Sequence, residues 1–236
     1  MSDPEQRQSD QGIDVAWSDV VRFLRQLSHD LRNHLNAVEL QSAFLAELAT
    51  DAELKEEIKR LRKMVSDSGS ALQKLTTRIN PPAPNITSYG ARAFIEDLQT
   101  KVGTEFPSQA ASVNWHIDDL NAAATIDPVL LREALLELLK NAFEHQKEGA
   151  SIDFIAKREG DNLVLTLNEP KGQFDLPTAD WGREPLRRPA RTHYGLGLNR
   201  ARIIIEGQQG TLRARYDAAE SKLITTVTVP VSDAQA

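Results

Sequence analysis

Apolar residues recur at helical spacing through two long segments at the start of the sequence. In residues 14–49 the steps alternate near three and four, which places the apolar side chains on one helix face. In residues 51–79 they follow a heptad repeat in which Ser68 fills one position. The first set is Trp17, Val20, Leu24, Leu27, Leu31, Leu35, Val38, Leu45 and Leu48, and the second is Leu54, Ile58, Leu61, Val65, Leu72, Leu75 and Ile79. Between them, Thr50-Asp51-Ala52-Glu53 is typical of a helix stop followed by a capping box. The pattern predicts a helical hairpin with a very short turn.

A single helical hairpin cannot cover both of these apolar seams. Pairing two copies into a four-helix bundle would cover them, so the sequence predicts a homodimer. The alternative is that the seams dock on the C-terminal domain of the same chain.

A proline-rich stretch marks the clearest domain boundary. Asn80-Pro81-Pro82-Ala83-Pro84-Asn85 cannot continue a helix, and residues 81–90 are expected to form a stiff linker. The hairpin then occupies residues 14–80, preceded by a disordered arm at residues 1–13. Beyond the linker, the pattern predicts helices at 91–102, 128–146 and 198–206, and strands at 112–117, 151–157, 162–168, 211–216 and 222–231. The predicted fold class is therefore α+β, with an α/β sandwich at residues 91–232 after the hairpin.

Composition excludes several classes of function. The net charge of -6 gives no reason to expect nucleic acid as a partner, and the absence of cysteine excludes thiol catalysis and thiolate metal sites. No apolar run approaches the roughly 18 residues that span a bilayer, so no membrane insertion is expected. The polar, acidic N-terminus lacks the apolar core of a signal peptide, and we expect a cytoplasmic protein.

The first candidate site lies on the first helix, in Ser28-His29-Asp30-Leu31-Arg32-Asn33. His29 falls between seam positions and points away from the seam, and Asn33 is one turn further on the same face. An exposed imidazole can act as a nucleophile, and the adjacent Asp30 can orient it or accept its proton. The other interpretation is an exposed histidine of a bundle helix with no chemical role.

The second candidate site is on the helix that begins with Asp127-Pro128, an N-cap followed by proline at the first helical position. Glu137, Asn141 and His145 are spaced by four, so they line one face, and a carboxylate and an amide one turn apart suit Mg²⁺. The other interpretation is a solvated polar face.

Further along, Gly195-Leu196-Gly197-Leu198 precedes a helix whose free N–H groups could bind phosphate. The loop before it carries Arg183, Arg187, Arg188 and Arg191, and it is expected to be a lid over a nucleotide. The other interpretation is a disordered basic loop.

In order and spacing, these motifs resemble the catalytic core of a two-component sensor histidine kinase. His29-Asp30-Leu31-Arg32-Asn33 is similar to the H-box, whose histidine receives the γ-phosphoryl group. The residues from Glu137 to His145 are similar to the N-box, whose asparagine holds Mg²⁺, and Gly195-Leu196-Gly197-Leu198 is similar to the G2 box. The resemblance implies a dimerising phosphotransfer hairpin and an ATP-binding domain of the GHKL (Bergerat) type, with ATP and Mg²⁺ as cofactors.

The sequence departs from the family pattern at two places. His34 replaces the H-box proline. In the family, a turn with the pattern Asp-x-Gly-x-Gly contacts the adenine amino group. Here Asn168 is assigned to the position of the aspartate and Pro170 to that of the first glycine. Of the two glycines, only Gly172 is present. An asparagine carbonyl can still accept a hydrogen bond from an amine, but without charge.

The resemblance implies an ATP-dependent protein-histidine kinase that phosphorylates His29 and passes the phosphoryl group to an aspartate of a response-regulator receiver domain. It also implies that Asn33 orients water for the reverse, phosphatase-like reaction. A separate sensory or signal protein is an expected partner, because only about 13 residues precede the first helix. The altered turn favours one alternative, a histidine phosphotransferase or phosphatase that no longer uses ATP. A dimerising interaction protein is the other.

Overall fold

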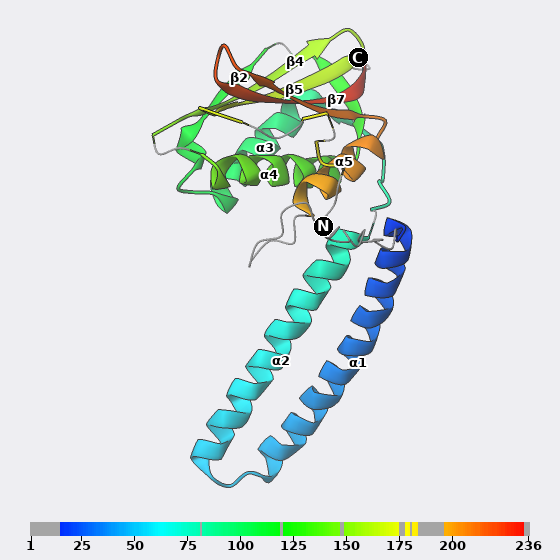
Figure 1. Cartoon of the computed structure of the whole chain (residues 1–236), viewed down its shortest axis with the longest axis vertical. Coiled ribbons are helices and arrows are strands. Elements are labelled where there is room, and N and C mark those ends of the chain that lie inside the picture. The colour runs from blue at the N-terminus through cyan, green and yellow to red at the C-terminus, as the bar shows by residue number, and fades with distance from the viewer. Residues whose placement is uncertain are drawn as a thin grey trace, which may run out of the picture. The chain divides into compact units, whose positions relative to one another are not determined.

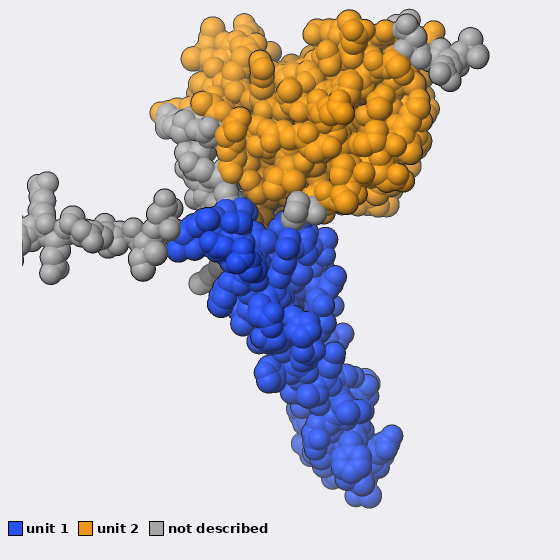
Figure 2. Space-filling view, turned by 90° about the vertical axis from the view of Figure 1, so that its right-hand side faces the viewer, with its two compact units in different colours: residues 1–80 blue, residues 81–236 orange. Residues whose placement is uncertain are grey.

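The computed structural model describes residues 15–80, 82–118, 120–146, 149–174, 178–179, 181–183 and 196–233. The chain divides into two compact units, residues 1–80 and residues 81–236 (Figure 2). The predicted N-terminal arm and most of the predicted arginine-rich lid lie outside the described residues.

The first unit is an antiparallel helical hairpin (Figure 1). Helix α1 spans Trp17–Leu48 and helix α2 spans Ala52–Ile79. The turn works as its sequence predicts, since the Asp51 side chain caps α2 by accepting a hydrogen bond from the Leu54 backbone N–H at 3.0 Å. Among the described helices, none combines the length and apolarity that a membrane span requires.

The most buried positions of α1 lie next to the predicted apolar seam, and most of them carry small residues. Val21, Ser28, Ser42 and Ala49 are buried at steps that are multiples of seven. Four residues of the predicted seam, Trp17, Val20, Leu24 and Leu35, are half-buried. The other five remain 41 to 62% exposed in the single hairpin; they are Leu27, Leu31, Val38, Leu45 and Leu48. The contact with α2 therefore covers the apolar seam only in part; Leu35, for example, would lie 4.0 Å from a Cβ added to Gly69.

Polar contacts flank this narrow helix–helix contact. Arg25 Nε donates to Asn80 Oδ1 at 2.5 Å, and Arg32 Nη2 donates to Gln73 Oε1 at 2.5 Å. Near the turn, Arg62 donates to Glu39 Oε1 from Nε and Nη2, at 2.9 and 2.7 Å. These contacts link α1 to α2 at three levels along the hairpin.

The second unit is a seven-stranded sheet with helices on one face (Figure 1). The strand order is β1-β3-β7-β5-β4-β2, and β6 also pairs with β7. The strands are β1 (Thr87–Gly90), β2 (Val113–Ile117), β3 (Ala122–Ile126), β4 (Ile152–Glu159), β5 (Asn162–Pro170), β6 (Thr211–Asp217) and β7 (Lys222–Asp233). The helices are α3 (Ala91–Glu105), α4 (Pro128–Glu144) and α5 (Gly197–Glu206), with a short 3-10 helix at Ala110–Ser112.

The core lies between the sheet and these helices, and α4 is central to it. Its start is fixed by Asp127, whose Oδ1 accepts hydrogen bonds from the N–H groups of Val129 and Leu130 at 3.0 Å. The other carboxylate oxygen accepts from the Asn85 backbone N–H at 2.8 Å, and this contact ties the start of the unit to the helix. The face of α4 that bears Leu131, Leu135 and Leu138 is buried in the core.

The predicted helical hairpin and α/β sandwich are confirmed, with one correction at their junction. Residues 87–90 were expected to be linker but form β1, which pairs antiparallel with β3. The pattern also missed β3 itself, because Ala122, Ala123 and Ala124 carry little of the β-branched or aromatic signal that marks a strand.

Candidate functional site

The His29 side chain is 67% exposed on α1. Its Nδ1 lies 3.2 Å from Asp30 Oδ1 and 3.4 Å from Asn33 Nδ2. Both neighbours engage the same ring nitrogen, and Nε2 makes no hydrogen bond with any described residue. The structure thus brings together the three predicted residues and leaves Nε2 open to a reactant.

Asp30 and Asn33 favour opposite tautomers of the imidazole. An ionised Asp30 carboxylate can only accept a hydrogen bond, so its contact requires a proton on Nδ1 and leaves the lone pair on Nε2. The amide N–H₂ of Asn33 donates a hydrogen bond, so its contact requires the lone pair on Nδ1. The hydrogen bond with His29, followed by one from Gln26 at 3.0 Å, lowers the pKa of Asp30. An ionised Asp30 that holds the Nδ1 proton leaves Nε2 nucleophilic.

In the second unit, α4 carries the next predicted residues toward the start of α5. A Cβ added to Gly197 would lie 2.6 Å from Glu137 Oε2, so the carboxylate rests against the backbone of the first residue of α5. Glycine leaves room for this approach, and a negative charge is favourable at a helix N-terminus. Leu196 before it is buried and Leu198 after it packs on the core, whereas Gly195 is outside the described residues.

Asn141 and His145 lie further along α4. The Asn141 side chain is half-buried and makes no hydrogen bond within the part of the chain that the structure describes. His145 is the C-cap of α4 with an exposed side chain, and its backbone carbonyl accepts a hydrogen bond from Lys171 Nζ at 3.0 Å. It is therefore the carbonyl of His145, and not the ring, that takes part in the described contacts.

The end of β5 differs from the sequence-based expectation. Leu163, Leu165 and Leu167 belong to the core between sheet and helices, and strand alternation places Glu169 on that same face. Asn168 lies on the opposite face, paired with Asp153 of β4, and its Oδ1 is buried without a hydrogen-bond partner. Glu169, which the sequence reasoning missed, is the polar side chain that the end of β5 presents on the helix-covered face. The alternation of the three leucines is the signal that could have identified it.

Glu169 is 3% exposed and forms an ion pair with Lys171, whose Nζ lies 3.3 Å from Oε2. The pair lacks hydrogen-bond geometry, so Oε2 is a buried acceptor whose hydrogen bond is unmade. Burial raises the pKa of Glu169, and the charge of Lys171 opposes this shift. The exposed Gly172 contributes its carbonyl, which accepts a hydrogen bond from Tyr216 Oη at 3.3 Å.

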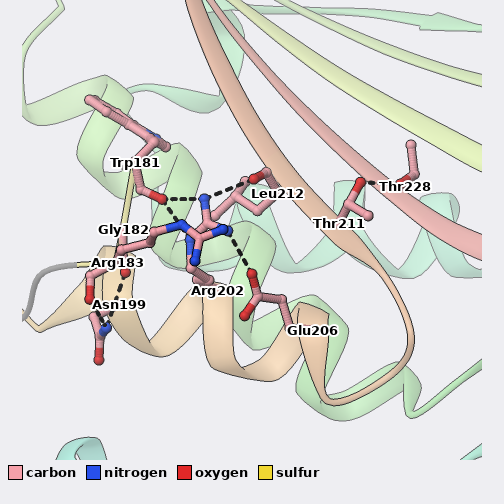
Figure 3. Close-up of polar contacts among 9 residues, drawn as sticks. All are labelled: Trp181, Gly182, Arg183, Asn199, Arg202, Glu206, Thr211, Leu212 and Thr228. Carbon is pink, nitrogen blue, oxygen red and sulfur yellow. Dashed lines mark hydrogen bonds and ion pairs between the residues drawn. The ribbon is translucent and has the colours of Figure 1, made fainter. Parts of the chain in front are cut away.

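A buried arginine holds the segment that leads into the predicted lid (Figure 3). Arg202 donates from Nε to the Trp181 carbonyl at 2.7 Å, and from Nη2 both to that carbonyl and to the Leu212 carbonyl at 2.8 Å. Asn199 Nδ2 donates to the Gly182 and Arg183 carbonyls at 3.0 and 3.1 Å. Residues 181–183 are thereby fixed against α5 and β6.

Glycine is required within this held segment. Gly182 has a positive φ of 74°, and a Cβ there would lie 2.7 Å from the Leu198 carbonyl oxygen. Trp181 is buried, and its ring centroid lies 5.7 Å from that of Phe174. Arg187, Arg188 and Arg191 of the predicted lid are outside the described residues.

No protein-family model matches the chain. Two curated proteins of Pseudomonas aeruginosa are similar to it in sequence. A bacteriophytochrome is 24% identical over 235 residues, covering 91% of this chain and 30% of that protein. The alginate biosynthesis sensor protein KinB is 25% identical over 210 residues, covering 82% of this chain and 34% of that protein. The chain spans about a third of the length of the curated relatives it matches.

Solved structures share the fold of the chain. Full-length ShkA in complex with AMPPNP superposes with a TM-score of 0.63 at 16% identity, covering 91% of this chain and 47% of that one. The chain has the fold of a histidine kinase catalytic core. Histidine kinase AdeS of Acinetobacter baumannii gives a TM-score of 0.50 at 17% identity, covering 86% of this chain and 97% of that one. The resemblance found in the sequence is thus confirmed.

In this fold, the oxygen donors on α4 fit a magnesium nucleotide. Glu137 and Asn141 offer the oxygen ligands that Mg²⁺ prefers, and Mg²⁺ commonly takes few protein ligands because water and substrate phosphates complete its shell. The described residues contain no cluster of three or more histidine, cysteine or acidic side chains that would bind a metal without such help. The N–H groups at the start of α5 lie beside Glu137 and suit phosphate.

Proposed function

We propose that the chain is the core of an ATP-dependent protein-histidine kinase in which His29 receives the phosphoryl group. The observation that carries this proposal is the arrangement at His29, where Asp30 engages Nδ1 and Nε2 is left exposed. An exposed histidine without a chemical role needs no carboxylate at Nδ1.

In the proposed reaction, Nε2 attacks the γ-phosphorus of ATP. An N–P bond forms, the bond to the β–γ bridging oxygen breaks, and ADP leaves. The Nδ1 proton stays on the ring, where the Asp30 carboxylate stabilises the resulting imidazolium. Glu137 and Asn141 would hold Mg²⁺, which supplies charge neutralisation when it is bound. The start of α5 would bind phosphate oxygens, and Asn168, Gly172, His145 and Gly195–Leu198 remain further candidates for nucleotide contact.

The phosphoryl group would then pass to an aspartate of a response-regulator receiver domain, and Asn33 would orient water for the reverse reaction. Residues 14–80 would form the dimerisation and phosphotransfer hairpin, and the ATP-binding domain would extend from β1 to residue 232. The exposed apolar seam of α1 supports a homodimer, because pairing two hairpins would cover it. We also propose a cytoplasmic location and a separate signal protein as partner.

The test is a comparison of phosphodonors. The protein and its Asn141→Ala variant are incubated with Mg²⁺ and γ-labelled ATP, and separately with a labelled phospho-receiver domain. We expect acid-labile label from ATP on the natural protein and at least about a hundredfold less on the variant, with transfer from the receiver domain unaffected. Label from the receiver domain alone would refute ATP use and identify a phosphotransferase.

That phosphotransferase is the second candidate function, and one observation favours it. Lys171 and Glu169 form a buried ion pair at the end of β5, in the turn that departs from the family pattern. A domain that no longer takes nucleotide would retain such a pair as a structural contact, and His29 would exchange phosphoryl groups only with receiver domains.

A further inference from the structure

The middle and the C-terminal end of α4 face two chemically different ends of the proposed nucleotide site. Glu137 lies at the start of α5, where free N–H groups and the helix dipole suit phosphates. His145 lies eight residues further, a distance of roughly 12 Å along a helix axis. There the described groups include Glu169, a buried carboxylate with an unmade hydrogen bond. A base with an exocyclic amino group is the part of a nucleotide that would satisfy Glu169.

Lys171 already occupies this end. Its side chain is only 12% exposed, and its ammonium contacts both acceptors there, the Glu169 carboxylate at 3.3 Å and the His145 carbonyl at 3.0 Å. The backbone at Lys171 is anchored as well, because its N–H donates to the Ser221 carbonyl at 2.7 Å and its own carbonyl accepts from Tyr216 Oη at 3.1 Å. Because the backbone of Lys171 is held in place, its ammonium group lies within reach of both acceptors.

Displacing Lys171 would be costly. A neutral amino group would have to replace a cation that compensates a buried carboxylate, and breaking a buried ion pair is strongly unfavourable. When only a fraction of the protein molecules is in the state that can bind a ligand, the apparent affinity is the intrinsic affinity multiplied by that fraction. Nucleotide binding is thereby weakened without any change at the phosphate end.

We propose that Lys171 is an internal competitor for the nucleotide base, which holds Glu169 and the C-terminal end of α4 together and sets the nucleotide affinity of the site. This inference rests on the proposed nucleotide site between α4 and α5. In this view the altered turn lowers the affinity for an aminopurine nucleotide but does not abolish the nucleotide site.

The test is calorimetric titration of the full chain with Mg-AMPPNP and, separately, with Mg-tripolyphosphate, which has no base. Lys171→Ala removes the competitor, and Lys171→Met keeps the bulk of the side chain without its charge, should the alanine variant fail to fold. Lys157→Ala is the matched control, because Lys157 pairs with Glu159 at 2.6 Å on an exposed part of β4. Circular dichroism checks that each variant is folded.

We expect Lys171→Ala, or Lys171→Met in its place, to tighten AMPPNP binding at least about tenfold and to leave tripolyphosphate binding and the control unchanged. If the natural protein binds AMPPNP and both Lys171 variants bind it equally or more weakly, the inference is overturned and the nucleotide site stands. Equal tightening for tripolyphosphate would also overturn it, because Lys171 would then act on phosphates. If neither the natural protein nor the variants bind AMPPNP, the nucleotide site and the inference both fail.

Discussion

Replacement of Arg202 by methionine should destabilise the second unit by about 3 kcal/mol. The change removes charged donors from two buried carbonyl acceptors, those of Trp181 and Leu212. Each stranded acceptor costs roughly 1–3 kcal/mol, and relief of the buried cation offsets part of the sum. The contact with Glu206 at 2.6 Å adds little, because that partner is half exposed. For a unit of this size the melting temperature should fall by roughly 6–12 °C.

Urea denaturation followed by circular dichroism and tryptophan fluorescence measures the loss. Arg215→Met is the matched control, since Arg215 is 65% exposed and pairs with Asp217 at 3.1 Å; its change should stay within about 0.5 kcal/mol. Arg202→Lys should be intermediate, because an ammonium keeps the charge but cannot fork to both carbonyls. A loss below about 1 kcal/mol for Arg202→Met would refute the view that this side chain fixes residues 181–183.

Three further perturbations probe the two sites. Gly197→Ala should push the Glu137 carboxylate aside and weaken magnesium-dependent AMPPNP binding several-fold in calorimetry. The free energy of unfolding should change by less than about 1 kcal/mol, because the displaced atom ends a flexible side chain. Unchanged AMPPNP binding would count against a role for Glu137. Removal of the imidazole by His29→Ala should raise the pKa of Asp30 in an NMR titration, since the hydrogen bond with His29 is the main cause of its lowered value; no upward shift would contradict that cause. Burial raises the pKa of Glu169, so the folded state binds more protons than the unfolded state above the ordinary value of 4.5, and stability must fall as pH rises from there toward the raised pKa. Glu169→Gln should flatten this fall in denaturation measured across pH, and an unaltered slope would show that another group causes it.

The sequence predicts the elements of the hairpin well and its buried face poorly. Period and capping residues identify both helices, because they are local properties of the chain. Part of the contact face of α1 escapes the pattern because Ser28, Ser42 and Ala49 are small or polar, and hydrophobicity selects the bulkier residues beside them. Small residues allow close approach of two helices, which becomes visible only when the partner helix is in place.

At the second site, the limits of prediction follow from strand geometry and tertiary contact. The candidate residues on α4 are predicted from their spacing alone. The choice between Asn168 and Glu169 depends on the face of β5, and a shift of one residue exchanges the two faces. The contact of Lys171 with the His145 carbonyl joins residues that are 26 apart in the chain, which no local pattern reports.

The central claim is that Nε2 of His29 is the phosphoacceptor, and His34 offers the sharpest comparison. Both histidines are exposed on α1, but only His29 has its Nδ1 engaged by the adjacent carboxylate. The decisive measurement is acid-labile incorporation of label from γ-labelled Mg-ATP into the natural protein, His29→Ala and His34→Ala. The account predicts label on the natural protein and on His34→Ala, and none on His29→Ala. Label that persists on His29→Ala and disappears from His34→Ala would contradict it.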